Sequence, residues 1–252
     1  MAEEIMPLQG HLKDLRKVFI VSGLSLLAGS FVIFLAWGDW LFQFLTGPVR
    51  NLDVPVISIR VTEIFMTKIK ISLLAGFVVS FPVIVFQIWG FVWPALTKAE
   101  RRMTAVLVPL SILLFAAGLS FAYFTVFPAA VRFLLLMAGE GLKPMITVGE
   151  YLSFTVAFFI PFGLAFEMPL VVYVLGKLGI IRPAALSRNR KYALLLVMVA
   201  AAVLTPGPDV VSQLMMAVPV YLLYELSIWV SYLVWRKERR EMEKEMAVGI
   251  QA

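Results

Sequence analysis

Long apolar runs, separated by short segments rich in charge and proline, make up most of the chain. About 20 helical residues cross the roughly 30 Å hydrocarbon core of a bilayer, so each long run predicts one transmembrane helix. With charged residues as boundaries, six spans are predicted, at residues 18–37, 71–93, 103–131, 151–176, 192–204 and 210–235. The predicted fold is therefore an all-α integral membrane protein with a single membrane domain.

The last two predicted spans are irregular. Residues 192–204 offer only about 20 Å of helix before Thr205-Pro206-Gly207-Pro208, too little to cross a bilayer unaided. The span 210–235 is interrupted by Pro219 and Glu225. Short spans thin the bilayer locally, tilt or leave a hydrated gap. Two full crossings and a re-entrant hairpin both remain open.

The segment before the first span predicts a helix of its own. Leu8, Leu12, Leu15 and Phe19 repeat at helical spacing, which indicates an interfacial helix on the membrane surface within residues 1–17. The apolar run that follows is longer than a signal-peptide core and has no small-residue cleavage site after it. It is therefore expected to be a permanent span.

Helix-start signatures mark three of the connections between spans. Asp39 predicts the beginning of a short helix over residues 40–46. The segments 97–100 (Thr-Lys-Ala-Glu) and 147–150 (Thr-Val-Gly-Glu) both fit a capping box, in which the first side chain and the fourth satisfy backbone N–H groups reciprocally.

Composition excludes a water-soluble globule. Hydrophobic residues make up 61% and charged residues 15%, against about 45–50% and about 25% in soluble domains. The net charge of +6 is carried mainly by short loops between spans, which indicates membrane topology and not nucleic-acid binding. The chain has no cysteine and one histidine, His11, so disulfides, thiol catalysis and multi-histidine metal sites are excluded.

The basic residues are distributed unevenly between the two sides of the membrane. Most of the 22 lysines and arginines lie in the N-terminus, the loops 94–102 and 177–191, and the tail 236–252. The other side holds only Arg50, Arg60, Lys68, Lys70, Arg132 and Lys143. By the positive-inside rule, both termini and the charged tail are predicted to be cytoplasmic. A re-entrant hairpin at the end of the chain would leave this unchanged.

Glu167 is a carboxylate inside the apolar stretch 151–176. A charged group at bilayer depth costs about 2.5–3.5 kcal/mol on insertion scales, and it persists where it faces a bundle interior, a partner or water. Pro161 and Pro169 flank it, and each frees a carbonyl near the acid. We predict a bent helix with a functional polar site on a concave face of the protein.

Glu225 is predicted to lie at a similar depth. Glu167 precedes Lys177 by ten residues and Glu225 precedes Arg236 by eleven, or roughly 15 Å of helix in each case. The functional interpretation is a second acid of the same polar patch. The alternative is snorkelling or hydrogen bonding to the neighbouring residues Tyr221, Tyr224 or Ser227.

Two further acids lie on the predicted cytoplasmic side, Glu100 and Asp14. Each has a structural alternative. Glu100 is the last residue of a capping box and could simply hold the backbone N–H of Thr97. Asp14 could pair with Lys17 or complement the helix dipole.

Enzyme signatures are absent from the sequence. It contains no H-E-x-x-H, G-x-S-x-G, S-x-x-K, Walker A or G-x-G-x-x-G pattern. We therefore expect no enzyme, no nucleotide-driven pump and no cofactor.

A series of short segments, in order along nearly the whole chain, resembles the TatC family, the core membrane subunit of the twin-arginine protein translocase. These segments are His11-Leu12-x-Asp14-Leu15-Arg16-Lys17, Phe81-Pro82, Phe91-Val92-Trp93-Pro94-Ala95-Leu96, Glu100-Arg101-Arg102, Ala122-Tyr123-Phe124-Thr125-Val126-Phe127-Pro128, Tyr151-Leu152-Ser153-Phe154, Phe162-Gly163-x-x-Phe166-Glu167-x-Pro169 and Leu204-Thr205-Pro206.

The resemblance implies a receptor for signal peptides with paired arginines, in the inner (cytoplasmic) cell membrane. It would act with single-span partners of the TatA/TatB type, and with other copies of itself, to export folded proteins by the protonmotive force. The resemblance implies that residues of the N-terminal segment and the first cytoplasmic loop bind the signal peptide: Glu100, Asp14, Phe91, His11, Arg16 and Leu15. The family more often has glutamate where this chain has Asp14.

The resemblance also implies two sites further along the chain. Glu167 matches the acid of the family's fourth helix, and residues before and within the sixth helix would dock a partner subunit: Thr205, Pro206, Asp209 and Gln213. Some relatives have two adjacent prolines where this chain has Pro206-Gly207-Pro208.

Two other classes of function compete with this interpretation. A proton-coupled secondary transporter could use Glu167 and Glu225, but such transporters usually have two related halves, and none is apparent here. A purely structural assembly scaffold is the second alternative. Cross-linking to a twin-arginine peptide, but not to its twin-lysine version, would separate the receptor from both.

Overall fold

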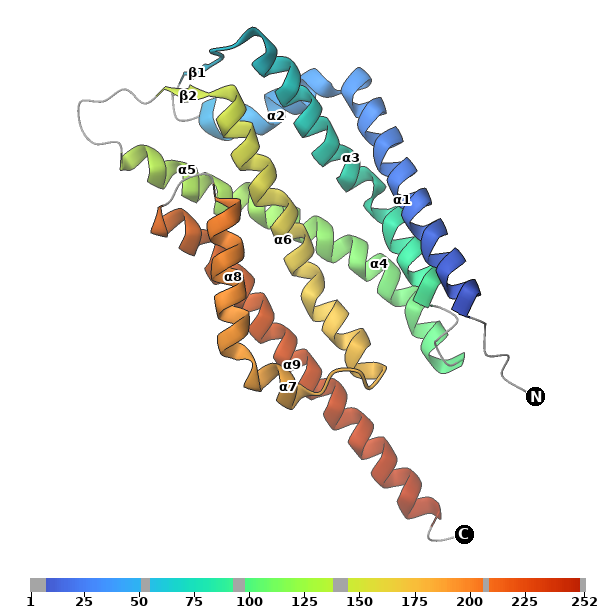
Figure 1. Cartoon of the computed structure of the whole chain (residues 1–252). Helices are drawn as coiled ribbons and strands as arrows, with labels where there is room; N and C mark the ends of the chain where they lie inside the picture. The colour runs from blue at the N-terminus through green and yellow to red at the C-terminus, as the bar shows by residue number, and fades with distance from the viewer. Residues whose placement is uncertain (1–7, 51–54, 93–97, 138–144, 206–208, 250–252) are drawn as a thin grey trace. The chain divides into compact units, whose positions relative to one another are not determined.

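The computed structural model describes the backbone of residues 8–50, 55–92, 98–137, 145–205 and 209–249, with side chains throughout except at 8–12, 50, 98–104, 136 and 237–249. The described chain is mostly helical (Figure 1). Its helices are α1 (Leu8–Ala36), α2 (Gly38–Arg50), α3 (Val61–Val92), α4 (Lys98–Phe121), the π-helix η2 (Ala122–Val126), α5 (Phe127–Leu136), α6 (Val148–Lys177), α7 (Pro183–Arg188), α8 (Arg190–Leu204) and α9 (Val210–Gly249). Two short strands, β1 (Val56–Ile57) and β2 (Ile146–Thr147), pair in parallel.

Five stretches of helix in the described part of the chain are long and apolar enough to cross a membrane. They are Lys13–Ala36, Val61–Val92, Ala105–Leu135, Val148–Lys177 and Val210–Arg236. Each overlaps one of the predicted spans, so the integral membrane class is confirmed. The remaining predicted span corresponds to α8, which has 15 residues and a length of about 22 Å. It is short, as predicted.

Three elements differ from the sequence prediction in detail. The segment predicted as a separate surface helix is helical from Leu8 but continues directly into the first span as α1. The short helix predicted to begin at Asp39 is confirmed, and α2 extends it to Arg50. The third predicted span is divided by η2, where the N–H of Phe127 reaches the carbonyl of Ala122. Pro128 follows at once and has no N–H to donate, which favours a local π-bulge.

The chain folds as two compact units, Met1–Leu113 with Ala138–Val156 and Leu114–Met137 with Ala157–Ala252. In the first unit, α1 and α3 lie side by side (Figure 1). The hydroxyl of Ser80 donates to the carbonyl of Ser25 at 2.7 Å, and a Cβ on Gly76 would lie 2.6 Å from the backbone N of Ser30. The absence of a side chain at Gly76 therefore permits this crossing, as small residues do between membrane helices.

Gly76→Ala is expected to destabilise the protein by about 1–3 kcal/mol, the usual cost of overpacking. The added methyl group would collide with backbone atoms of α1, which cannot move aside as a side chain can. Gly90→Ala is the matched control, because it lies in the same helix with nothing within 4 Å of its Cβ position. Thermal unfolding in detergent measures both. Equal unfolding temperatures for the two variants would contradict the close crossing.

One carboxylate joins the starts of two helices at the other end of the first unit. Glu63, in the first turn of α3, accepts the backbone N–H of Gly149 at 2.7 Å and that of Ile59 at 2.9 Å. Unpaired N–H groups at helix starts favour an anionic acceptor. Beside this link, Val56 pairs with Ile146 in the β1–β2 ladder. The starts of α3 and α6 are thereby held together.

In the second unit, α4 and α6 approach closely at two glycines. A Cβ on Gly118 would lie 2.7 Å from the carbonyl O of Phe162, and one on Gly163 would lie 2.5 Å from the ring of Phe115. Aromatic rings fill the adjoining core: Phe158 and Phe162 stack, and Phe127 packs edge-on against Phe158. Such pairs add about 0.5–1.5 kcal/mol beyond burial. In the same unit, α8 folds back against α9 (Figure 1).

Candidate functional site

The helix register of the first unit places Asp14 near the level of Phe91. Ser25 contacts Ser80, and Ser30 lies against Gly76. Because α1 and α3 run antiparallel, the residue numbers of two facing residues add to about 105. The same register pairs position 14 with position 91. Asp14 is exposed, and Phe91 is half-buried in the last turn of α3.

The other predicted signal-peptide residues lie on the elements around this point. Leu15 and Arg16 are exposed on α1, with 38% of Leu15 accessible. Glu100 is the third residue of α4, and His11 lies in the first turn of α1; their side chains are outside the described set, as is Thr97 of the capping box. The segments that begin α1, end α3 and begin α4 thus all belong to the first unit.

The second predicted capping box is described by the structure. The hydroxyl of Thr147 accepts the backbone N–H of Glu150 at 3.3 Å. This is the forward half of the box, and it begins α6 where the sequence predicts.

Glu167 lies within α6, which continues unbroken through Pro161 and Pro169. The acid is half-buried. Its neighbour Phe166 packs against Phe121 of α4, with ring centroids 5.7 Å apart. Because proline donates no N–H, Pro169 leaves the carbonyl of Ala165 without its usual intrahelical donor, two residues before the acid. The surroundings therefore combine an apolar core with polar backbone groups.

Glu225 has two partners in the second unit. Arg190, at the start of α8, donates from Nη2 to Oε2 at 2.8 Å, and the hydroxyl of Tyr221 donates to Oε1 at 3.0 Å. Tyr221 was one of the neighbours that the sequence offered as a partner. The ion pair with Arg190 was not predicted, because the two residues are 35 positions apart. Tyr224, another suggested partner, donates instead to the carbonyl of Leu186 at 2.8 Å.

A contact further along α6 and α9 relates the positions of the two acids along these helices. A Cβ on Gly176 of α6 would lie 3.7 Å from Cγ1 of Val234 on α9. Glu167 precedes Gly176 by nine residues, and Glu225 precedes Val234 by nine. Each acid is therefore about 13 Å of helix from the same contact.

The residues predicted to dock a partner also shape the α8–α9 turn. Asp209 caps α9, with Oδ1 accepting the N–H of Ser212 at 2.6 Å. Gln213 donates from Nε2 to the carbonyl of Met198 on α8 at 2.8 Å, and buried Thr205 donates to the carbonyl of Ala201. Pro206 lies outside the described residues. Gln213 thus joins α9 to α8, while Thr205 and Asp209 make local bonds at the two helix ends that face the turn.

Two residues with evident roles were missed by the sequence analysis. Glu63 links two helix starts, and its only sequence signal is an acid in the first turn of a helix. Arg190 neutralises Glu225. Nothing in the sequence sets Arg190 apart from the other basic residues of its loop. Within the described part of the chain, no group of three or more histidine, aspartate or glutamate residues is placed to hold a metal ion.

Comparison with known proteins decides the family. Residues 10–219 match the family model described as Sec-independent protein translocase protein (TatC). The chain belongs to the TatC family. It is 48% identical to the Sec-independent protein translocase protein TatC of Carboxydothermus hydrogenoformans, over 94% of this chain and 98% of that one. The corresponding protein of Aquifex aeolicus is 41% identical over 95% of this chain and all of its own length.

The fold of this TatC-family chain matches a solved structure. A crystal structure described as twin arginine translocase receptor TatC superposes with a TM-score of 0.82 at 40% sequence identity. The match covers 89% of this chain and 99% of that one. TatC of Escherichia coli K12 is 37% identical over 96% of this chain and 94% of its own. The resemblance first seen in short motifs therefore extends over most of the fold.

Proposed function

We propose that this chain is the receptor subunit that recognises twin-arginine signal peptides for export of folded proteins. The observation that carries the proposal is the near full-length match, in sequence and fold, to a protein described as the twin arginine translocase receptor. A purified sample should cross-link a twin-arginine peptide and fail to cross-link its twin-lysine version. Equal cross-linking of both peptides would contradict a receptor that recognises arginine.

The arginine-binding surface is assigned to Glu100 and Asp14, with Phe91, Leu15, Arg16 and His11 around them. A guanidinium is best bound by carboxylates, which accept two parallel hydrogen bonds and provide the opposite charge. The register that sets Asp14 level with Phe91 supports a shared surface. The exposed side chains of Asp14, Leu15 and Arg16 are accessible to a peptide.

Glu167 and Glu225 are assigned to a polar site within the membrane that supports translocation. Intramembrane acids are costly and mark functional sites, and Glu167 lies half-buried in an apolar helix. Glu225 is expected to contribute less, because Arg190 and Tyr221 already occupy both of its oxygens. Partner subunits with a single span are assigned to the turn between α8 and α9, with Thr205, Pro206, Asp209 and Gln213 as the docking residues.

Family membership favours the translocase over the secondary transporter. Every relative reported above is a protein translocase component by name. The export system needs an external energy source, for which we propose the protonmotive force, since the sequence contains no nucleotide-binding motif.

The chain is further proposed to lie in the inner cell membrane, to cross it six times and to have both termini in the cytoplasm. The uneven distribution of basic residues supports this orientation. The chain has no cysteine, so single cysteines at Ala2, Ala99, Gly141 and Ala247 can be labelled without background. An impermeant thiol reagent outside intact cells is expected to label only the Gly141 variant.

Labelling after cell lysis is the control, because all four variants should then react. Labelling of the Ala99 variant from outside intact cells would reverse the proposed orientation.

A further inference from the structure

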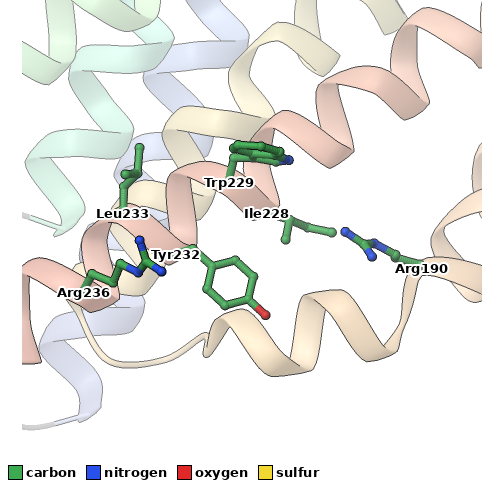
Figure 2. A pocket seen from close by; sticks show the side chains of 6 residues that line it. All are labelled: Arg190, Ile228, Trp229, Tyr232, Leu233 and Arg236. Atoms are coloured by element: carbon green, nitrogen blue, oxygen red, sulfur yellow. The ribbon is translucent and has the colours of Figure 1, made fainter.

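A pocket of about 390 Å³ lies beside the last apolar turns of α9, next to the start of α8. Figure 2 shows it between two arginines, with aromatic and aliphatic side chains between them. The lining residues are Arg190, Ile228, Trp229, Tyr232, Leu233 and Arg236. All of them belong to the second unit.

The two guanidiniums give the pocket a positive rim. Arg190 uses Nη2 to bind Glu225 at 2.8 Å, and its side chain remains 49% exposed, so its other N–H groups are accessible. Arg236 is exposed, and within the described residues no carboxylate pairs with it. Guanidinium groups bind phosphate oxygens with two parallel hydrogen bonds. The rim therefore favours an anion, with Arg236 as its main contact.

The wall of the pocket is apolar and open to the outside. Trp229 is 69% exposed and Leu233 is 67% exposed, while Ile228 is buried. Tyr232 is held by its hydroxyl, 3.1 Å from the hydroxyl of Ser187 on α7. Contact with this apolar wall would not stabilise a small hydrophilic anion. Hydrocarbon chains would cover the wall and be stabilised by the contact.

The position along α9 matches the membrane–water interface. The apolar span Val210–Arg236 ends at Arg236, so Trp229 and Tyr232 lie within its last two turns. Trp and Tyr are enriched where membrane spans meet the headgroup region. Basic pockets between membrane helices at this level bind the headgroups of anionic lipids.

We propose that this pocket binds an anionic phospholipid. Its phosphate contacts Arg236, and its acyl chains lie along Trp229 and Leu233. The proposal goes beyond signal-peptide recognition, since none of these six residues is assigned to the signal-peptide surface.

The test measures lipid binding by the delipidated, full-length protein in detergent. Phosphatidylglycerol and phosphatidylcholine are titrated separately, and bound lipid is counted by native mass spectrometry. Loss of a charge-assisted hydrogen bond should weaken phosphatidylglycerol binding to Arg236→Gln by about tenfold or more. Arg182→Gln is the matched control, because it removes the same charge from an exposed residue outside the pocket. It should bind within about twofold of the unmodified protein.

The outcomes separate the possible occupants. Preference for phosphatidylglycerol, lost in Arg236→Gln and retained in Arg182→Gln, supports the proposal. Equal weakening by both variants would indicate general surface charge and overturn it, as would unchanged binding to Arg236→Gln at an unchanged unfolding temperature. Displacement of the lipid by inorganic phosphate at equal concentration would indicate a small-anion site, and displacement by an acidic peptide a protein-docking site; either would overturn the proposal.

Discussion

Glu100→Gln is expected to weaken binding of a twin-arginine signal peptide about 10- to 100-fold. The substitution keeps the shape of the side chain and removes the charge, and a hydrogen bond to a charged group contributes roughly 1.5–3 kcal/mol. Glu100→Arg should weaken binding further, because it adds repulsion. Peptide binding to purified protein measures the effect, with the twin-lysine peptide as the baseline.

A second acid at a helix start provides the matched control for Glu100. Glu150 is exposed and belongs to the capping box that begins α6, on the opposite side of the membrane in the proposed topology. Glu150→Gln should bind the peptide normally. Both variants should insert and fold, since each change is at the start of a helix. If Glu100→Gln bound as tightly as the unmodified protein, its role would be to cap α4.

Glu167→Ala is expected to abolish most export of a folded reporter while signal-peptide binding and protein level stay normal. Removing a buried charge can leave stability unchanged or raise it, since the desolvation cost disappears. A purely structural acid would therefore tolerate the change. The expected loss arises because the inserted peptide or partner subunit loses its polar contact inside the membrane. Export, cross-linking and thermal unfolding in detergent are measured together.

Two variants serve as comparisons for Glu167→Ala. Glu167→Gln keeps a hydrogen-bonding group and should retain more export than the alanine variant. Glu225→Ala should give a milder export defect, and it also leaves Arg190 without the carboxylate to which it donates, so its unfolding temperature should fall. Normal export by Glu167→Ala at normal protein level would mean that this acid has no part in translocation.

Short-range patterns accounted for the helices but not for how they pack. Apolar length predicted the spans, and Asp39 predicted the start of α2, because both effects depend on neighbours in sequence. The π-helix η2 was missed, since a single shifted hydrogen bond before Pro128 leaves the apolar pattern unchanged. The β1–β2 pairing was missed as well, because it joins segments about ninety residues apart.

The residues of the candidate site also separate into those that the sequence could predict and those that it could not. Glu167 could be found from the sequence alone, because a carboxylate in an apolar run is anomalous wherever the helix packs. Arg190 could not be found, because many basic residues lie in the same loop and only the α8–α9 hairpin selects the one that reaches Glu225. The role of Glu63 could not be found either. In the sequence it is an ordinary acid in the first turn of a helix, and only the pairing of β1 with β2 brings the N–H of Gly149 to it.

The sequence by itself determined that this is a helical membrane protein, gave approximate boundaries for its spans, and suggested its family and the acid at bilayer depth. These properties follow from hydrophobic length and the cost of charge in hydrocarbon, which each segment carries independently of the others. Only the tertiary structure decided that α1 packs closely against Gly76, that Ser80 bonds to Ser25, and that Arg190 pairs with Glu225. Those contacts depend on which helix faces come together, because side-chain packing and not local hydropathy sets the register between helices.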